Sequence, residues 1–206
     1  YVPLYRTSDG EISTQWTMGW SEAIGLLKMD FLGLRNLTVI QKAEKLISER
    51  IGRKFLVSEA PMDDKQTFKL FGDGLTVGVF QFESSGMQEY LKKLKPSRIE
   101  DLIAMNALYR PGPMSMIDDF IDRKFGRKKI EYLHPDLEPI LKETNGIIVY
   151  QEQVMRIASD LAGFSLAQAD LMRRAMGKKK KEVMEEQKTK FIAGCVEKGI
   201  EKKTAV

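Results

Sequence analysis

Residues 36–52 read NLTVIQKAEKLISERIG, and at this stretch the chain takes on a helical pattern. Asn36 is a suitable cap because its side chain can accept a hydrogen bond from a free helix amide. Gly52 is a suitable end because glycine readily adopts the left-handed conformation that closes many helices. Apolar side chains stand at helical spacing between them, namely Leu37, Ile40, Ala43, Ile47 and Ile51. The stretch therefore predicts an amphipathic helix with one apolar face.

The chain after residue 52 continues to read as mainly helical. Serine or aspartate at the starts and glycine or proline at the ends delimit the segments. Ser97 and Ser165 are each followed three residues later by Glu or Gln, which is the capping-box pattern. One further strand is expected in GLTVGVFQF, residues 74–82. Helices are expected over residues 64–71, 84–95, 97–109, 115–125, 135–144 and 151–162, and from 165 onward.

The N-terminal part has a different pattern. Residues 8–10, Ser-Asp-Gly, suit a turn between two short extended segments. IGLLKMDFLGL, residues 24–34, is too densely apolar for a clean helix stripe, and it predicts a buried strand. Alternation along that strand sets Lys28 and Asp30 on one face. We therefore expect a mainly α protein, divided near residue 35 between a short strand-bearing piece and a helical domain.

Length and composition exclude several classes of protein. The chain has 206 residues, enough for one or two globular domains. Its one cysteine cannot form an internal disulfide, and with one histidine it cannot build a zinc site of Cys and His ligands. No apolar run approaches the roughly 18 to 20 residues of a membrane helix, and no signal peptide opens the sequence. We expect a soluble, cytoplasmic protein with no membrane partner.

The positive charge of the chain is concentrated in one segment. The net charge is only +4, but RRAMGKKKK, residues 173–181, carries six basic residues and no acidic one. Such a cluster creates a focused potential that favours a polyanion such as nucleic acid or a triphosphate. The alternative is a solvated, lysine-rich helix end without a ligand.

Asp30 is the first candidate site residue. A carboxylate within an apolar strand is costly to desolvate unless a cation or metal meets it. Lys28 on the same face could form a structural salt bridge with it, or the two could line the rim of a site. One aspartate alone cannot hold the two divalent ions of a phosphoryl-transfer site, which needs two or three convergent carboxylates.

Arg110 is the second candidate. It lies in ALYRPGPM, residues 107–114, where a helix should end against two prolines and a glycine. A rigid backbone would hold the guanidinium at a fixed corner, which suits bidentate recognition of phosphate or carboxylate. The alternative is an arginine that folds back onto the last carbonyls of its helix.

The helix expected from Ser165 provides the third group of candidates. Arg173 and Arg174 lie near its far end, and Arg174 shares a face with Lys178 at a spacing of four residues. Cations placed against a triphosphate and its leaving pyrophosphate are a main source of rate in phosphoryl transfer. The same charges would equally suit a DNA backbone.

Five motifs, in this order, resemble those of the alpha subunit of bacterial DNA polymerase III, the C family of replicative polymerases. Together they reach from near the start of the chain to the basic segment, and the last 25 residues match more loosely. The motifs are LLKMDFLGLRNLT, TVGVFQFESSGM, NALYRPGPM followed by DRKFG, GIIVYQEQVM, and AGFSLAQADLMRRAMGKKK.

The resemblance implies a polymerase active site divided between this chain and other segments. Residues 1–35 would be the closing part of a palm similar to that of polymerase beta, and residues 36–206 an incomplete fingers domain. Asp30 would be the last of three palm aspartates that hold two Mg²⁺ ions, and Lys28 would face the same site and help to bind the nucleotide. The other two aspartates lie N-terminal to this region in the family, so we expect the chain alone to be inactive.

The resemblance also implies ligands and partners. The substrates would be primer-template DNA and a deoxynucleoside triphosphate (dNTP), in the cytoplasm of a bacterium and associated with the nucleoid. The sliding clamp and other replisome subunits would bind through regions outside this chain. Triphosphate contacts fall to Arg110, Arg173 and Arg174, with Lys178 behind them, and DNA contacts to Lys179, Lys180 and Lys181.

Two other functions stay open at this point. The chain could be a non-catalytic helical module that grips nucleic acid, or a purely structural helical domain. A polymerase fragment should bind free nucleotide weakly with the help of magnesium, whereas a binding module should prefer DNA and ignore nucleotide. The charged face of Lys28 and Asp30 and the basic segment disfavour a purely structural role.

Overall fold

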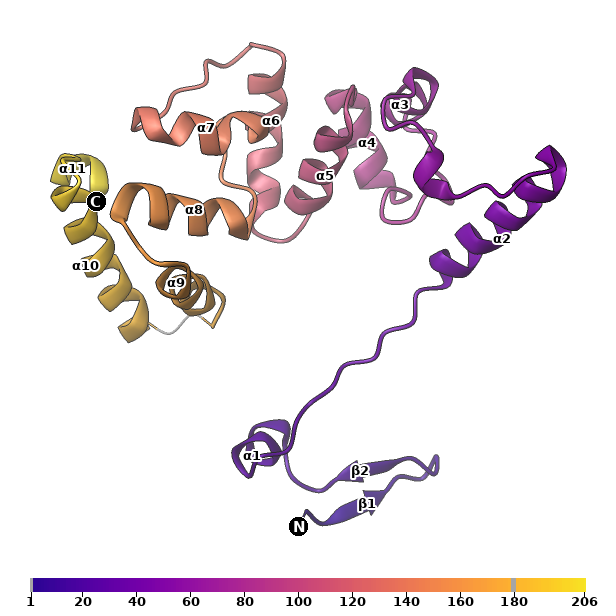
Figure 1. Cartoon of the computed structure of the whole chain (residues 1–206), viewed down its shortest axis with the longest axis horizontal. Helices are drawn as coiled ribbons and strands as arrows, with labels where there is room; N and C mark the ends of the chain where they lie inside the picture. Colours follow the sequence, from indigo (N-terminus) through magenta and orange to yellow (C-terminus); the bar gives the residue numbers. More distant parts are fainter. Residues whose placement is uncertain (1, 179–180) are drawn as a thin grey trace. The chain divides into compact units, whose positions relative to one another are not determined.

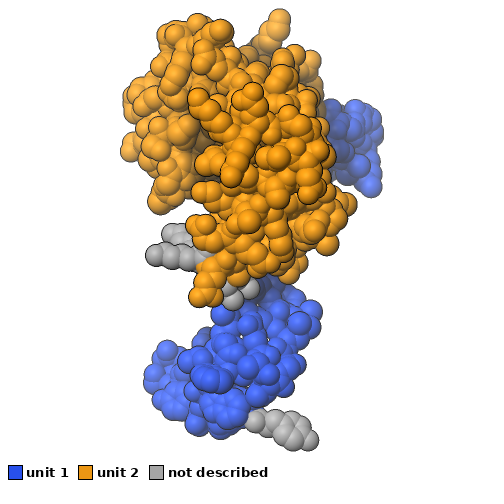
Figure 2. All heavy atoms as spheres, turned by 90° about the vertical axis from the view of Figure 1, so that its left-hand side faces the viewer, with its two compact units in different colours: residues 1–59 blue, residues 60–206 orange. Residues whose placement is uncertain are grey.

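The computed structural model of the protein describes residues 2–178 and 181–206, with the side chains of Lys178 and Lys181 left out (Figure 1). The chain is mainly α-helical, with one two-stranded sheet near its N-terminus. It divides into two compact units, residues 1–59 and residues 60–206 (Figure 2). The expected fold class is confirmed.

The first unit begins with the expected hairpin. Strands β1 (Leu4–Arg6) and β2 (Ile12–Thr14) pair antiparallel, with Tyr5 opposite Ser13. Gly10 closes the turn: its N–H donates to the Thr7 carbonyl at 3.0 Å, and its φ of +86° favours glycine. A short helix, α1 (Met18–Ala23), follows and was not expected from the sequence.

The strand expected over residues 24–34 is absent. The described backbone has no regular structure from residue 26 to residue 34, and its apolar side chains are exposed, with Phe31 at 91%. A strand needs a neighbour for its backbone N–H and C=O groups, and within the described chain only β1 and β2 form a sheet. The densely apolar sequence indicated burial here, but the described residues of the first unit supply no surface that buries it.

The helix expected over residues 36–52 is confirmed. It is α2 (Arg35–Ile51), and Gly52, with a φ of +69°, ends it. Asn36 is not its cap, because the helix starts one residue earlier and the cap position falls on Leu34. The short helix η1 (Val57–Glu59) follows. No described residue of the first unit is buried, so the apolar face of α2 has no cover within it.

The second unit has two hydrophobic clusters. The first is enclosed by five helical segments and a loop. Asp64 and Ser84 cap helices as expected: their side chains accept from the backbone N–H of Thr67 and Met87. The core of this cluster includes Met87, Leu91, Leu94, Met105, Leu108, Ile117 and Phe120. The elements are α3 (Lys65–Gly72), α4 (Ser85–Leu94), α5 (Ile99–Leu108), η2 (Pro113–Met116) and α6 (Ile117–Lys124).

The strand expected over residues 74–82 is also wrong, because these residues form successive turns. Gly74 and Gly78 have φ values of +69° and +80°, and Gln81 is at +67°. Left-handed residues at these positions turn the chain, so it cannot run straight as a strand.

The second cluster lies among the C-terminal helices. Its core includes Ile140, Leu141, Ile157, Ala158, Leu161, Phe164 and Cys195. Gly194 lets its helix approach Ala162 closely, since a Cβ at residue 194 would collide with the Ala162 carbonyl. The elements are η3 (Pro135–Leu137), α7 (Glu138–Leu141), η4 (Lys142–Thr144), α8 (Gln151–Ala162), α9 (Leu166–Lys178), α10 (Lys181–Glu197) and α11 (Lys202–Ala205).

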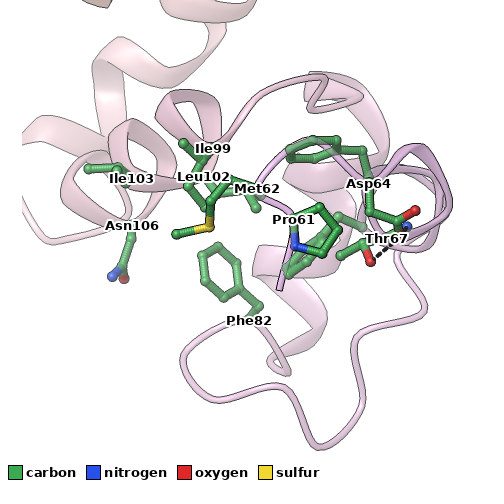
Figure 3. Close-up of a pocket in the computed structure, with 11 residues that line it drawn as sticks. Pro61, Met62, Asp64, Thr67, Phe82, Ile99, Leu102, Ile103 and Asn106 are labelled. Atoms are coloured by element: carbon green, nitrogen blue, oxygen red, sulfur yellow. Dashed lines mark hydrogen bonds between the residues drawn. The ribbon is translucent and has the colours of Figure 1, made fainter. Parts of the chain in front are cut away.

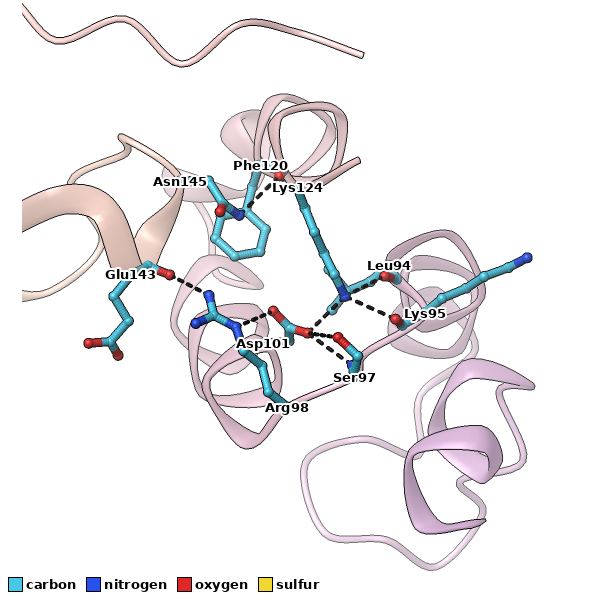
Figure 4. A network of polar contacts seen from close by, with 9 residues as sticks. All are labelled: Leu94, Lys95, Ser97, Arg98, Asp101, Phe120, Lys124, Glu143 and Asn145. Atoms are coloured by element: carbon cyan, nitrogen blue, oxygen red, sulfur yellow. Dashed lines mark hydrogen bonds and ion pairs between the residues drawn. The ribbon is translucent and has the colours of Figure 1, made fainter. Parts of the chain in front are cut away.

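A buried carboxylate joins three helices of the first cluster (Figure 4). The Asp101 side chain is 1% exposed, and its Oδ2 accepts from Lys124 Nζ at 2.8 Å and from the backbone N–H of Ser97 at 3.0 Å. Lys124 also donates to the carbonyls of Leu94 and Lys95, at 3.0 and 2.9 Å, at the end of α4. Asp101 thus takes the partner role at the start of α5 that the capping-box pattern assigned to Glu100.

Burial opposes ionisation of Asp101. The hydrogen bonds from Lys124 and Ser97, with the charges of Lys124 and Arg98, outweigh it and hold the pKa of this carboxyl below its ordinary value. Because the folded pKa is the lower one, the carboxylate stabilises the fold above its ordinary pKa. That stabilisation is lost as the pH falls below about 4.

Replacing Lys124 by methionine should lower the free energy of unfolding by about 3 kcal/mol, because it leaves a buried carboxylate without its closest cation. Lys128→Met is the matched control. Lys128 pairs with Asp119 at 2.7 Å but is half exposed, so its loss should cost less than about 1 kcal/mol. Urea unfolding followed by circular dichroism measures both, and equal midpoints for the two variants would contradict the assignment.

Candidate functional site

Lys28 and Asp30 meet in the first unit, although they do not lie on a strand. Lys28 Nζ is 3.1 Å from Asp30 Oδ1, and the two side chains are 50% and 79% exposed. An exposed pair of this kind contributes little to stability. Both charged groups therefore remain accessible to a ligand.

The described residues do not make a complete metal site. No group of three or more His, Cys, Asp or Glu side chains in residues 2–178 and 181–206 is arranged to hold an ion. Asp30 can supply one carboxylate ligand, whereas two Mg²⁺ ions need several converging oxygen ligands. The residues of this chain thus do not fit a two-ion site by themselves.

Arg173 and Arg174 share one carboxylate on α9. Arg173 donates from Nε and Nη2 to Asp170 Oδ1 at 2.9 and 2.8 Å, and Arg174 Nε forms an ion pair with Asp170 Oδ2 at 2.7 Å. The spacings of three and four residues bring the side chains together on one helix face. Arg173 Nη1 also donates to Gln151 Oε1 on α8 at 3.0 Å.

The capping box expected at Ser165 sets the start of α9. The backbone N–H of Ser165 donates to Gln168 Oε1 at 2.8 Å, and the N–H of Gln168 donates to Ser165 Oγ at 3.3 Å. These reciprocal bonds satisfy two amides that would otherwise be unpaired at the helix end. They fix which residues of α9 share the face of Asp170.

The charge balance of this face favours an anion. The hydrogen bond from Arg173 lowers the pKa of Asp170, and the charges of Arg174 and Arg173 lower it further. The Asp170 carboxylate therefore carries a full negative charge at neutral pH. Two guanidiniums on one carboxylate leave a net positive charge. Arg174 is 64% exposed, and its two terminal nitrogens have no protein partner within the described residues.

Arg110 lies at the rigid corner that the sequence predicts. Helix α5 ends at Leu108, the N–H of Arg110 donates to the Leu108 carbonyl at 2.7 Å, and the Arg110 carbonyl accepts from Met114 N–H at 3.2 Å. Gly112 between them has a φ of +107°. The Arg110 side chain is exposed, and within the described chain it does not fold back onto a helix carbonyl.

Part of the basic segment lies outside what the structure describes. Lys178 is the last residue of α9 and Lys181 the first of α10, but their side chains are not described. Lys179 and Lys180 lie outside the described residues altogether. The four lysines therefore stay predictions from the sequence.

A separate pocket of about 300 Å³ lies among α3, α5 and the loop before α4 (Figure 3). Apolar side chains such as Met62, Phe82 and Leu102 line most of it. Its polar residues form hydrogen bonds with one another or with the adjoining loop. Asp64 Oδ2 accepts from Thr67 Oγ1 at 2.6 Å, and Asn106 Nδ2 donates to Gln81 Oε1 at 2.7 Å. No basic side chain lines the pocket, so it does not suit a phosphate group.

No helix in the described part of the chain is both long enough and apolar enough to span a bilayer.

Comparisons with known proteins agree with the motifs. A family model described as the bacterial DNA polymerase III alpha subunit finger domain matches residues 36–199. The chain is similar to the DNA polymerase III subunit alpha of Borreliella burgdorferi, with 54% identity over all of the chain. It is 52% identical over 96% of its length to the protein of the same name from Bacillus subtilis, and 52% identical over 97% to that of Caulobacter vibrioides.

The chain corresponds to 18% of the Borreliella and Bacillus proteins and 17% of the Caulobacter protein. It thus spans less than a fifth of the length of the curated relatives it matches. Most of the second unit and all of α2 except its first residue, Arg35, fall within the matched range. The chain belongs to the finger-domain family of the bacterial DNA polymerase III alpha subunit.

Proposed function

We propose that this chain forms part of a DNA-directed DNA polymerase, which transfers a nucleotidyl group from a dNTP to a primer 3′ end during replication. Residues 1–35 are the end of the palm and residues 36–206 most of the fingers. The observation that carries the proposal is the pair of guanidiniums held by Asp170 on α9, of which that of Arg174 is 64% exposed. Two guanidiniums side by side suit the phosphates of a dNTP, and the family to which the chain belongs is that of a polymerase finger domain.

The arginines neutralise the triphosphate. Arg174 offers its two terminal nitrogens, and Arg110 offers an exposed guanidinium from a rigid corner. A guanidinium matches two phosphate oxygens with two parallel hydrogen bonds. Fixed cations of this kind stabilise the charge that grows on the leaving pyrophosphate during an in-line attack by the primer hydroxyl. Lys178 adds charge behind them.

Asp30 supplies one of the acidic ligands of the metal site, and the remaining ligands come from outside this chain. A Mg²⁺ ion held there would lower the pKa of the primer hydroxyl and stabilise the charge of the triphosphate. Lys28, 3.1 Å from Asp30, limits the repulsion between this carboxylate and the phosphates.

Lys179, Lys180 and Lys181 contact the backbone of primer-template DNA. Regions outside this chain bind the sliding clamp and other replisome subunits. The protein works in the cytoplasm at the nucleoid.

Binding to the isolated chain tests this function against a non-catalytic nucleic-acid-binding module. We expect weak dNTP binding that strengthens with Mg²⁺ and is lost in Arg174→Ala, and no primer extension, because the chain has one metal ligand of the several required. Arg156→Ala is the control. Arg156 pairs with Asp160 at 3.6 Å, and both residues lie on α8, which packs beside α9. Tight DNA binding without any nucleotide binding would favour the binding module, and magnesium-dependent synthesis by the chain alone would contradict the proposal.

A further inference from the structure

We propose that Asp170 is a positioning residue that orients the arginine pair for the triphosphate, with Gln151 as its second support. The inference rests on the proposed function of Arg173 and Arg174 as triphosphate contacts. It assigns different tasks to the two arginines and a role to two residues that carry none in the resemblance.

The hydrogen bonds divide the two arginines into a fixed one and an available one. Arg173 uses Nε and Nη2 on Asp170 and Nη1 on Gln151, so each of its nitrogens has a protein partner. Arg174 is held at Nε alone, 2.7 Å from Asp170 Oδ2. The exposed fractions follow the same order, at 33% for Arg173 and 64% for Arg174. Arg173 therefore anchors the group to α8, and Arg174 presents the donors.

Gln151 is a firm support because the first turn of α8 is itself fixed. The backbone N–H groups of Val149 and Tyr150 both donate to Gln153 Oε1, at 2.8 and 2.9 Å. Gln153 is buried, and its Nε2 donates to the buried Thr144 Oγ1 at 2.8 Å. Satisfied buried polar groups of this kind rigidify the backbone around them. The contact from Arg173 to Gln151 thus ties α9 to this hydrogen-bonded turn.

Positioning and simple charge attraction predict opposite effects of losing Asp170. Removing its negative charge makes the group more positive, so Coulomb attraction alone predicts tighter nucleotide binding. Positioning predicts weaker binding, because two long side chains then lose their fixed geometry and must be ordered by the ligand itself. The sign of the change in nucleotide affinity therefore decides between the two.

The experiment uses a full-length polymerase III alpha subunit that carries this sequence. Asp170→Asn keeps the size of the side chain and removes its charge. We expect the KM for dNTP to rise between about 10-fold and 100-fold, as for misplaced binding groups elsewhere, while the Kd for primer-template DNA stays the same or falls. Asp170→Glu, which can still reach both arginines, should recover most of the affinity. Gln151→Met should raise the KM by a smaller factor.

The control is Asp160→Asn, which removes a carboxylate paired with Arg156 at the same spacing as Asp170 and Arg174 but on α8. It should leave the KM unchanged. A KM that falls or stays constant in Asp170→Asn would overturn the inference. If Arg174→Ala also changed neither KM nor kcat, the proposed function would fail as well. If only the arginine variant had an effect, the positioning role alone would be wrong. Should Asp170→Asn not fold, Gln151→Met decides, because it leaves the charge of the group unchanged and only positioning then predicts a raised KM.

Discussion

Replacing Asp30 by alanine in a full-length polymerase III alpha subunit that carries this sequence is expected to reduce primer extension at least about a thousandfold. In the proposed function the carboxylate is one ligand of a metal site that is completed from outside this chain. Residues 2–178 and 181–206 contain no group of three or more His, Cys, Asp or Glu side chains that could hold the ion in its place. The fold should persist, because Asp30 is 79% exposed and its ion pair with Lys28 is at the surface.

Primer extension at saturating dNTP and Mg²⁺ measures this effect, and circular dichroism confirms that the variant is folded. Glu22→Ala is the matched control, since it removes another exposed acidic side chain from the same unit. It should retain normal activity. Synthesis by Asp30→Ala at more than a few per cent of the normal rate would remove Asp30 from the metal site.

The helices could be predicted because their start and stop signals are local. Ser84 and Ser165 cap α4 and α9, and Gly163 ends α8 in the left-handed conformation at the residue where the pattern stops. Each signal acts between residues a few positions apart in sequence. Its outcome depends little on the rest of the chain.

The two strands expected beyond the hairpin are absent. A strand needs a neighbouring strand that can lie far away in the sequence, so local sequence alone does not predict it reliably. Residues 24–34 and 74–82 are rich in apolar side chains, which indicates burial but not what covers them. Residues 74–82 turn repeatedly at Gly74 and Gly78. A count of apolar residues does not detect such turns.

The candidate site shows the same division. Arg173 and Arg174 stand three and four residues after Asp170, so their shared carboxylate follows from helical spacing. Gln151 lies 22 residues before Arg173 and reaches it only because α8 and α9 pack together. In the sequence, Gln151 stands out only as part of the motif GIIVYQEQVM, and this motif does not indicate which side chain Gln151 contacts.

Arg174→Ala is expected to lower kcat/KM for nucleotide incorporation by about a hundredfold, the usual cost of removing a well-placed donor to developing charge. Two terminal nitrogens are lost, and a fixed cation is lost with them. Lysine at this position should recover only part of the activity, because a point charge does not reproduce two parallel hydrogen bonds to phosphate. Steady-state incorporation of one nucleotide at varied dNTP concentration provides the values.

Two comparisons make the Arg174 result specific. Arg156→Ala removes an arginine paired with an aspartate on α8 and should leave kcat/KM unchanged. Arg173→Ala should lower kcat/KM as well, because Arg174 then loses the partner that ties the group to α8. An effect of Arg156→Ala as large as that of Arg174→Ala would indicate general charge loss instead of a triphosphate contact.

The dNTP dependence of single-turnover incorporation, measured on a preformed complex with primer-template DNA, separates nucleotide binding from DNA binding. For Arg174→Ala we predict a half-saturating dNTP concentration raised at least about tenfold, with the Kd for primer-template DNA within about twofold of normal. An unchanged dNTP dependence together with weaker DNA binding would contradict the central claim that this face of α9 binds the triphosphate, and would assign it to the DNA backbone.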